Sequence, residues 1–170
     1  MADFPVTDLQ PTDHVAEGET APDFERPLVT DEYWEDAALS EVTDQGPVLL
    51  VFHPMDGCPR TTYIYNEIRS RGWDERDGFD IVGVSISTPY EHAQLLDERG
   101  IDIRLFSDPA NGVAEAYDVV NDRIGMAGVA EPRPAVYLLD EDRTVLYADV
   151  ATEWPDPPGY DALADALAAL

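Results

Sequence analysis

The only cysteine in the 170-residue chain, Cys58, lies among residues that activate a thiol. The apolar run at residues 47–52 before it is predicted to be a strand. Pro59 after it suits the first position of a helix, because the N–H that proline lacks would have no partner there. Cys58 is therefore predicted at the N-cap, where free helix amides and the positive end of the helix dipole favour thiolate over thiol. The charge of Arg60 strengthens this effect, and that of Asp56 opposes it.

A lone cysteine is often a buried apolar residue that packs without reacting. The neighbours of Cys58 are instead turn formers, Pro54, Gly57 and Pro59, and they favour the reactive interpretation. A single thiolate attacks a disulfide or a hydroperoxide and is then left as a mixed disulfide or a sulfenic acid. Turnover therefore requires an external thiol, because the chain has no second cysteine to resolve the product.

The charge balance is strongly acidic, with 36 Asp and Glu against ten basic residues and a net charge of −26. All ten basic residues are arginine, and this composition resembles proteins of salt-loving microbes, whose charges are screened within about 3 Å in molar salt. An acidic surface that binds a basic partner is the alternative. Nucleic acid and anionic membrane are excluded as expected partners, because both require clustered basic residues.

One cysteine rules out an internal disulfide and a cysteine-rich zinc site, and neither metal nor cofactor is expected. The first residues do not resemble a secretory signal, and no window of about 18 apolar residues occurs, so a cytoplasmic location is expected. Residues 1–19 are predicted to be an acidic, mobile lead-in. Residues 20–170 are predicted to form one domain.

Short apolar runs alternate with amphipathic segments along that domain. Strands are predicted at residues 47–53, 79–86, 101–106, 135–140 and 144–150, and helices at residues 59–71, 89–99, 109–117 and 160–170. Ser87 or Thr88 caps the second helix, and Gly100 ends it. The last two strands form a hairpin. This order predicts an α/β fold with a mixed central β-sheet and helices on both faces.

Four segments resemble motifs of a known family. They are Gly18-Glu19-Thr20-Ala21-Pro22-Asp23-Phe24, the strand and turn at residues 48–54, residues 105–109 with 113–117, and Val136-Tyr137-Leu138-Leu139-Asp140. Together with the order of elements, they are similar to the thioredoxin fold and, within it, to the peroxiredoxin branch, the alkyl hydroperoxide reductase and thiol-specific antioxidant family. The resemblance covers nearly all of residues 18–150 and implies a thioredoxin-like fold and thiol-based redox chemistry.

The predicted active site departs from that family. The family signature is Pro-x-x-x-Thr-x-x-Cys, in which the cysteine attacks peroxide and the threonine positions it. Alignment from Pro54 places Cys58 at the threonine position and Thr61 at the cysteine position, so the two residue types are exchanged. The family also carries an arginine three residues before the aromatic residue of its last motif. That position holds Pro134 here, and Arg133 comes one residue earlier.

The rearranged motif is similar to the dithiol thioredoxin branch of the same fold. There the first cysteine of Cys-x-x-Cys is the nucleophile, and a cis-proline before a strand faces it. Cys58-Pro59-Arg60-Thr61 resembles that motif with its second cysteine replaced, and residues 134–137 resemble the cis-proline segment. A stiff loop without a chemical role is an equal interpretation of residues 132–134.

We therefore expect a peroxiredoxin-like, thiol-dependent redox protein. Seven residues are predicted to form its site: catalytic Cys58, Thr61 and Arg133, and a substrate or partner loop of Pro54, Pro59, Arg60 and Pro134. The expected partners are an external thiol or a thioredoxin-type reductant and a small hydroperoxide or a protein disulfide, and a homodimer is left open. Two alternatives remain, a monothiol disulfide exchanger and a binding or regulatory module that has lost catalysis.

Overall fold

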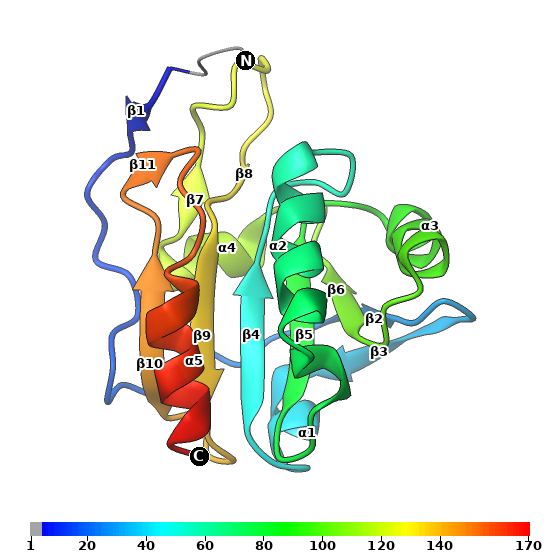
Figure 1. Ribbon diagram of the computed structural model, residues 1–170. Helices are drawn as coiled ribbons and strands as arrows, with labels where there is room; N and C mark the ends of the chain where they lie inside the picture. Colours follow the sequence, from blue (N-terminus) through cyan, green and yellow to red (C-terminus); the bar gives the residue numbers. More distant parts are fainter. Residues whose placement is uncertain (1–4) are drawn as a thin grey trace.

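A seven-stranded mixed sheet runs through the centre of the computed structural model, which describes residues 5–170 (Figure 1). Neighbouring strands follow the order β10 (Val145–Val150), β9 (Ala135–Leu139), β4 (Val48–Phe52), β5 (Asp80–Ser85), β6 (Arg104–Ser107), β2 (Glu25–Val29) and β3 (Trp34–Ala38). The pairs β4–β5 and β5–β6 are parallel, and the other neighbours are antiparallel. The predicted mixed sheet is confirmed.

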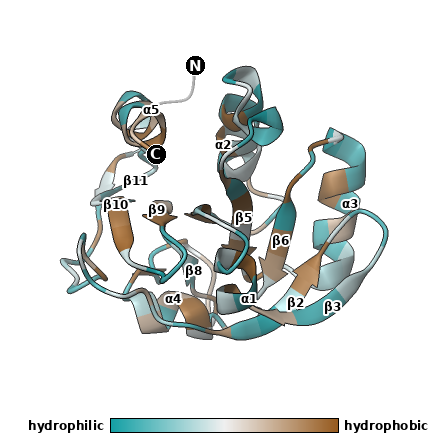
Figure 2. Ribbon diagram, turned by 90° about the horizontal axis from the view of Figure 1, so that it is seen from below, coloured by the Kyte–Doolittle hydropathy of each residue, from teal (hydrophilic) through white to brown (hydrophobic). Residues whose placement is uncertain are grey.

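Helices cover both faces of this sheet (Figure 2). One face carries α2 (Pro59–Ser70), α3 (Pro89–Arg99) and α5 (Tyr160–Ala168), and the other carries α1 (Leu39–Thr43) and α4 (Gly112–Tyr117). Every residue of β4 is buried, and its side chains alternate between the two layers. Leu49 and Val51 pack with α2, α3 and α5, whereas Leu50 and Phe52 pack with α1 and α4.

The ends of α2 and α3 follow the capping signals in the sequence. Cys58 is the N-cap of α2, and Pro59 occupies its first turn. Thr88 is the N-cap of α3 and accepts a hydrogen bond from the Glu91 N–H, while Gly100 ends the helix in the left-handed conformation (φ 59°). These local interactions set where each helix begins, independently of distant packing.

Several short elements were not predicted. They are the hairpin of β2 and β3, helix α1, the 3₁₀ turn η1 (Trp73–Glu75), and the pair β7 (Val120–Asn121) and β8 (Glu131–Pro132). Helix α4 begins at Gly112 and not at residue 109, because Asn111 before it has a positive φ of 59°. Strand β6 begins at Arg104, three residues later than expected.

The first described residues pack onto the domain, which corrects the expected boundary at residue 20. Strand β1 (Thr7–Asp8) pairs with β11 (Glu153–Trp154), and the side chains of Leu9 and Val15 are buried. Burial of one such apolar side chain stabilises the packed arrangement by roughly 1.5–3 kcal/mol. Residues 1–4 of the predicted lead-in lie outside the described residues.

Candidate active site

Cys58 lies where the sequence places it, at the N-terminus of α2. The chain leaves β4 after Phe52 and turns through residues 53–57. Cys58 itself has an extended backbone (φ −74°, ψ 131°). Its side chain is half-buried, and its sulfur makes no capping hydrogen bond to the helix amides. The support that the helix gives a thiolate here is therefore that of the dipole and not of direct N–H contacts.

Thr61 has a structural role and does not face the solvent. Its side chain is fully buried, and its Oγ1 lies within hydrogen-bond distance of the carbonyl oxygens of Pro54 (2.8 Å) and Met55 (3.0 Å). A hydroxyl has one proton to donate, and these two carbonyls share it. The hydroxyl thus holds the turn before Cys58 closed, which differs from the predicted role of Thr61 as a direct partner of the thiolate.

Side chains from three other segments hold the Cys58 loop, which we define as residues 54–58. The Met55 N–H donates to Glu131 Oε2 of β8 (2.9 Å), and the Asp56 N–H donates to Ser87 Oγ (2.9 Å). The Asp56 carboxylate lies 2.7 Å from Nδ1 of His92 on α3. Burial raises the pKa of Glu131, and the Met55 N–H partly offsets this. The loop that carries Cys58 is therefore fixed at several points.

Arg133 binds backbone carbonyl groups through its guanidinium, which differs from its predicted catalytic role. Its guanidinium donates four hydrogen bonds to three backbone carbonyls, those of Val120 (3.0 and 3.1 Å), Gln10 (3.1 Å) and Ala151 (3.2 Å). The side chain is 4% exposed, and burial lowers its pKa. Arg133 comes one residue before the position at which the family carries its arginine. A shift of one residue along an extended segment reverses the direction of a side chain, so Arg133 points toward β7 and the N-terminal segment. The expected second cation beside Cys58 is thus not Arg133.

The predicted substrate or partner loop is only partly brought together. The register of β4 with β9 pairs Phe52 with Ala135, so Pro134 comes opposite His53, just before the Cys58 loop. Among residues 5–170 the only cis peptide bond is Trp154–Pro155, so the bond before Pro134 is trans and the resemblance to a cis-proline segment fails. Pro134 borders the site without the geometry that the thioredoxin comparison implies.

The other predicted loop residues surround the first turn of α2. Pro54 is buried beneath the loop, and Pro59 is exposed at the start of the helix. The Arg60 guanidinium lies 6.0 Å from the ring centroid of Tyr63, which is 60% exposed. Arg60 thus lies two residues after Cys58 in the sequence, with its guanidinium beside the exposed Tyr63 ring.

His53 lies fully buried behind the loop and is neutral. Its Nδ1 bonds the Pro54 carbonyl oxygen (2.7 Å), and because a carbonyl only accepts, Nδ1 carries the proton. Burial lowers the pKa of His53 to about 4, and the charge of Asp56 opposes this shift. His53 packs against the ring of Tyr65 on α2, at 5.1 Å between ring centroids.

We expect this buried histidine to make the protein less stable as the pH falls from about 6.5 to about 4. Unfolded His53 takes up a proton near its ordinary pKa of 6.5, whereas the folded residue does so only near 4, so the unfolded state gains the proton first. The resulting loss is about 3 kcal/mol at the acid end. Urea unfolding at several pH values measures it, and His53→Gln should remove this part of the pH dependence. An identical pH dependence in both proteins would contradict a neutral, buried His53.

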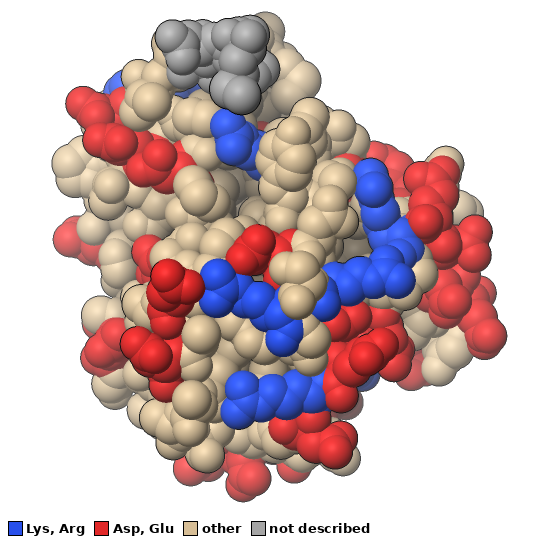
Figure 3. All heavy atoms as spheres, in the orientation of Figure 1, with Lys and Arg blue, Asp and Glu red and all other residues tan. Residues whose placement is uncertain are grey.

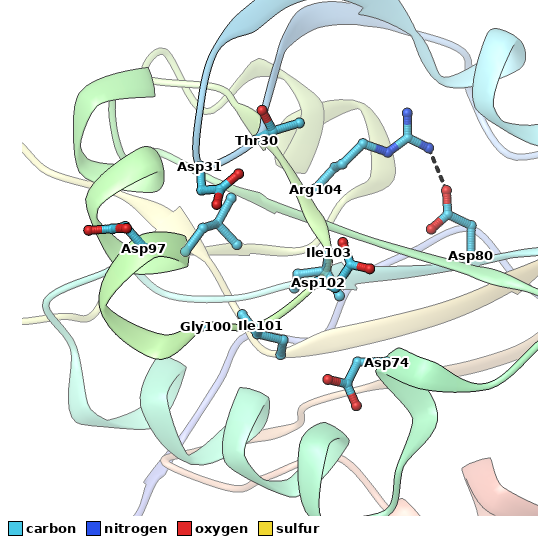
Figure 4. Close-up of a pocket in the computed structure, with 11 residues that line it drawn as sticks. Thr30, Asp31, Asp74, Asp80, Asp97, Gly100, Ile101, Asp102, Ile103 and Arg104 are labelled. Atoms are coloured by element: carbon cyan, nitrogen blue, oxygen red, sulfur yellow. Dashed lines mark hydrogen bonds and ion pairs between the residues drawn. The ribbon is translucent and has the colours of Figure 1, made fainter.

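Two cavities border α3, and several acidic side chains line the larger one. A cavity of about 480 Å³ beside α3 is lined by Asp31, Asp74, Asp80, Asp97 and Asp102 among others, with an ion pair between Arg104 and Asp80 (Figure 4). In the part of the chain that the structure describes, no three His, Cys, Asp or Glu side chains are grouped so as to hold a metal ion. A smaller cavity of about 260 Å³ lies between the Cys58 loop and α3.

The surface charges are unevenly distributed. Arginines gather over the face that carries α2, and acidic residues dominate the side formed by α3 (Figure 3). Arg69 lies in the last turn of α2, and Arg71, the C-cap of that helix, pairs with Glu67 and with Asp161 of α5. Within residues 5–170, no helix has the length and apolar character needed to cross a membrane.

The sequence profile of the AhpC/TSA family matches residues 18–148, which is most of the chain. The chain belongs to the AhpC/TSA family. The thiol peroxidase of Staphylococcus saprophyticus is 25% identical over 156 residues, which covers 89% of this chain and 87% of that protein. The predicted peroxiredoxin-like identity is confirmed, and the halophilic origin stays a prediction.

Solved structures agree with this assignment. The crystal structure of peroxidoxin BcpB from Mycobacterium tuberculosis superimposes with a TM-score of 0.73 at 28% identity, over 91% of this chain and 96% of that one. The thiol peroxidase from Chromobacterium violaceum gives a TM-score of 0.76 at 24% identity, over 97% and 91% of the two chains, and supports the fold. This AhpC/TSA protein is thus a peroxiredoxin-like redox protein with a single cysteine.

Sequence reasoning missed the residues that position the loop of this AhpC/TSA protein. Glu131, Ser87 and His92 were not among the predicted site residues, although each contacts residue 55 or 56. The one local signal is the place of His92 on α3, three residues before the buried Leu95 and so on the inward face of the helix. A buried histidine on such a face needs hydrogen-bond partners, and the sequence does not say which.

Proposed function

We propose that this AhpC/TSA protein reduces small hydroperoxides through Cys58 and that an external thiol completes each cycle. The observation that carries the proposal is the half-buried, reachable sulfur at the N-terminus of α2 in a chain with no other thiol. Its place at the positive end of the α2 dipole supports nucleophilic attack by this sulfur.

The reaction follows from the chemistry of one sulfur. The Cys58 thiolate attacks the nearer oxygen of the O–O bond, the alcohol or water leaves after taking up a proton, and Cys58 becomes a sulfenic acid. A first external thiol then displaces water and forms a mixed disulfide with Cys58. A second external thiol attacks that disulfide, releases the Cys58 thiol and leaves the two external sulfurs oxidised.

The test is the consumption of hydrogen peroxide and tert-butyl hydroperoxide with dithiothreitol as the donor. We expect many turnovers per protein molecule and, without donor, a dimedone adduct at Cys58 that reports the sulfenic acid. One slow equivalent of peroxide oxidised, together with rapid mixed-disulfide formation with a small disulfide, would instead identify a disulfide exchanger.

A specific observation favours a second candidate, a binding or regulatory module. Thr61, at the family's cysteine position, is fully buried and bonded to backbone carbonyls, and Arg133 is bonded elsewhere. Neither residue is thus available to polarise a peroxide. Absence of both turnover and mixed-disulfide formation in the assay above would select this candidate.

We propose the reaction partners by chemical class. The external reductant is proposed to be a small thiol or a thioredoxin-type protein, and the oxidant a small hydroperoxide. A homodimer and a cytoplasmic location stay predictions from the sequence.

A further inference from the structure

A histidine–aspartate pair joins the Cys58 loop to α3. His92 Nδ1 lies 2.7 Å from Asp56 Oδ2, and His92 Nε2 lies 3.0 Å from the carbonyl oxygen of Phe106 on β6. The His92 side chain is fully buried, and the Asp56 side chain is 7% exposed. The pair therefore bridges the loop, the helix and the sheet, largely out of contact with bulk water.

These two hydrogen bonds fix how many protons the pair holds. Because the Phe106 carbonyl only accepts, His92 Nε2 must carry a proton. If Asp56 is ionised, Nδ1 must carry a second proton, and if the Asp56 carboxyl is protonated, Nδ1 is bare. In either arrangement one proton lies between Asp56 and His92. Without it, His92 keeps one ring proton for two acceptors, and a bare ring nitrogen faces either Asp56 Oδ2 or the Phe106 carbonyl oxygen.

The groups around the pair do not replace that proton. The ring of His53, which directly follows β4, lies 6.1 Å from that of His92, and its Nδ1–H is already bonded. Burial lowers the pKa of His53 to about 4 and raises that of Tyr65 on α2, so both are neutral. The other facing groups, Glu91 and Glu98 of α3, line the small cavity beside the loop and have no proton to donate when ionised.

We propose that Asp56 and His92 form a proton-dependent latch that holds the Cys58 loop on α3 and thereby sets the exposure of the Cys58 sulfur. With the shared proton in place, the loop is closed as the structure shows it. When the proton is lost, the one ring proton left on His92 can serve either Asp56 or the Phe106 carbonyl but not both, so the joint hold of loop, helix and sheet weakens, the loop opens more often, and the sulfur becomes more accessible. Asp56 and His92 are positioning residues, and the proposal holds whether or not Cys58 reduces peroxide.

Three backbone amides report the closed loop. The N–H groups of Met55, Asp56 and Cys58 donate to Glu131 Oε2, Ser87 Oγ and the Met55 carbonyl, at 2.9 Å each. Their hydrogen-exchange protection, relative to intrinsic rates, measures loop opening. Measuring it in Cys58→Ser protein removes any contribution from titration of the sulfur.

Two variants of Asp56 in that background separate the latch from a merely structural contact. We expect protection of the parent to fall about tenfold or more as the pH is raised and the shared proton leaves. Asp56→Asn supplies a permanent N–H to the bare Nδ1 of neutral His92, so its protection should stay high over the whole pH range. Asp56→Ala cannot bond His92, and its protection should be low at every pH.

Labelling of Cys58 provides a second measurement in otherwise unchanged protein. Asp56→Asn and Asp56→Ala remove the same negative charge near the sulfur, so a difference between them reports the latch and not electrostatics. We expect N-ethylmaleimide to label the alanine variant about tenfold faster than the asparagine variant at the same pH.

Asp80→Asn is the matched control, because Asp80 is 45% exposed and pairs with Arg104 away from the loop. It should leave both protection and labelling unchanged. The latch is overturned if Asp56→Asn loses protection at high pH as its parent does, or if the two Asp56 variants are labelled at equal rates.

Discussion

Replacing Cys58 with serine is expected to abolish thiol-dependent peroxide consumption, by at least about 1,000-fold. The serine hydroxyl is not ionised near neutral pH and does not form a sulfenic acid, and the variant contains no other thiol. Serine is a favoured N-cap residue, so α2 should begin at the same place. The initial rate of peroxide loss with dithiothreitol measures the effect, and circular dichroism establishes that the fold is intact.

Thr62→Ser is the control for the Cys58 substitution. Thr62 lies in the same first turn of α2 and accepts a hydrogen bond from Arg99 Nη2 (3.2 Å), which a serine hydroxyl can also accept. We expect its peroxide consumption to match that of the unchanged protein. Donor-dependent consumption above background in the Cys58→Ser protein would show that the chemistry occurs elsewhere.

Replacing Arg133 with methionine is expected to lower the free energy of unfolding by about 4 kcal/mol or more. Methionine preserves much of the side-chain volume but leaves the carbonyl groups of Val120, Gln10 and Ala151 without the donors that they have in the structure. The loss is one of stability, since the guanidinium contacts backbone and not the Cys58 loop. Urea unfolding measures it, and N-ethylmaleimide labelling of the folded fraction should be unchanged.

Arg123→Met is the matched control for Arg133→Met. Arg123 is exposed and donates one long hydrogen bond, to the Asp8 carbonyl at 3.3 Å, so its loss should cost less than about 1 kcal/mol. Normal stability of Arg133→Met combined with a loss of Cys58 reactivity would restore the catalytic role that the sequence suggests for Arg133.

The sequence was sufficient to predict the centre of the fold because its signals there are local. The run of β4 is apolar at every position, as a strand covered on both faces must be, and Pro59 marks the start of α2. The same holds for Thr88 and Gly100 at the ends of α3. Together these features also placed Cys58 correctly at the N-cap of α2.

The remaining elements lack such local signals. Strand β2 contains Pro27, and β3 is exposed at Trp34, Glu35 and Asp36, so neither shows the alternation of a half-buried strand. The N-terminal segment shows little apolar periodicity in the sequence, yet it packs onto the domain. The Leu9 side chain is buried, and the Leu9 N–H donates to the carbonyl oxygen of Thr152.

The site was harder to predict than the fold because its supporting contacts are long-range. His92 reaches Asp56 across 36 residues of chain, and Glu131 reaches Met55 across 76. The direction of Arg133 depends on a single-residue offset before β9. Motif spacing identified the reactive sulfur but not the side chains that hold its loop.

The pairing of β1 with β11 has a consequence for how this molecule comes apart. The β1–β11 pair joins residues 7–8 to the segment just before α5, and the Arg133 guanidinium joins Gln10 to Ala151 in the same region. Opening of the segment at residues 7–10 would therefore also remove hydrogen bonds from residues 151–154.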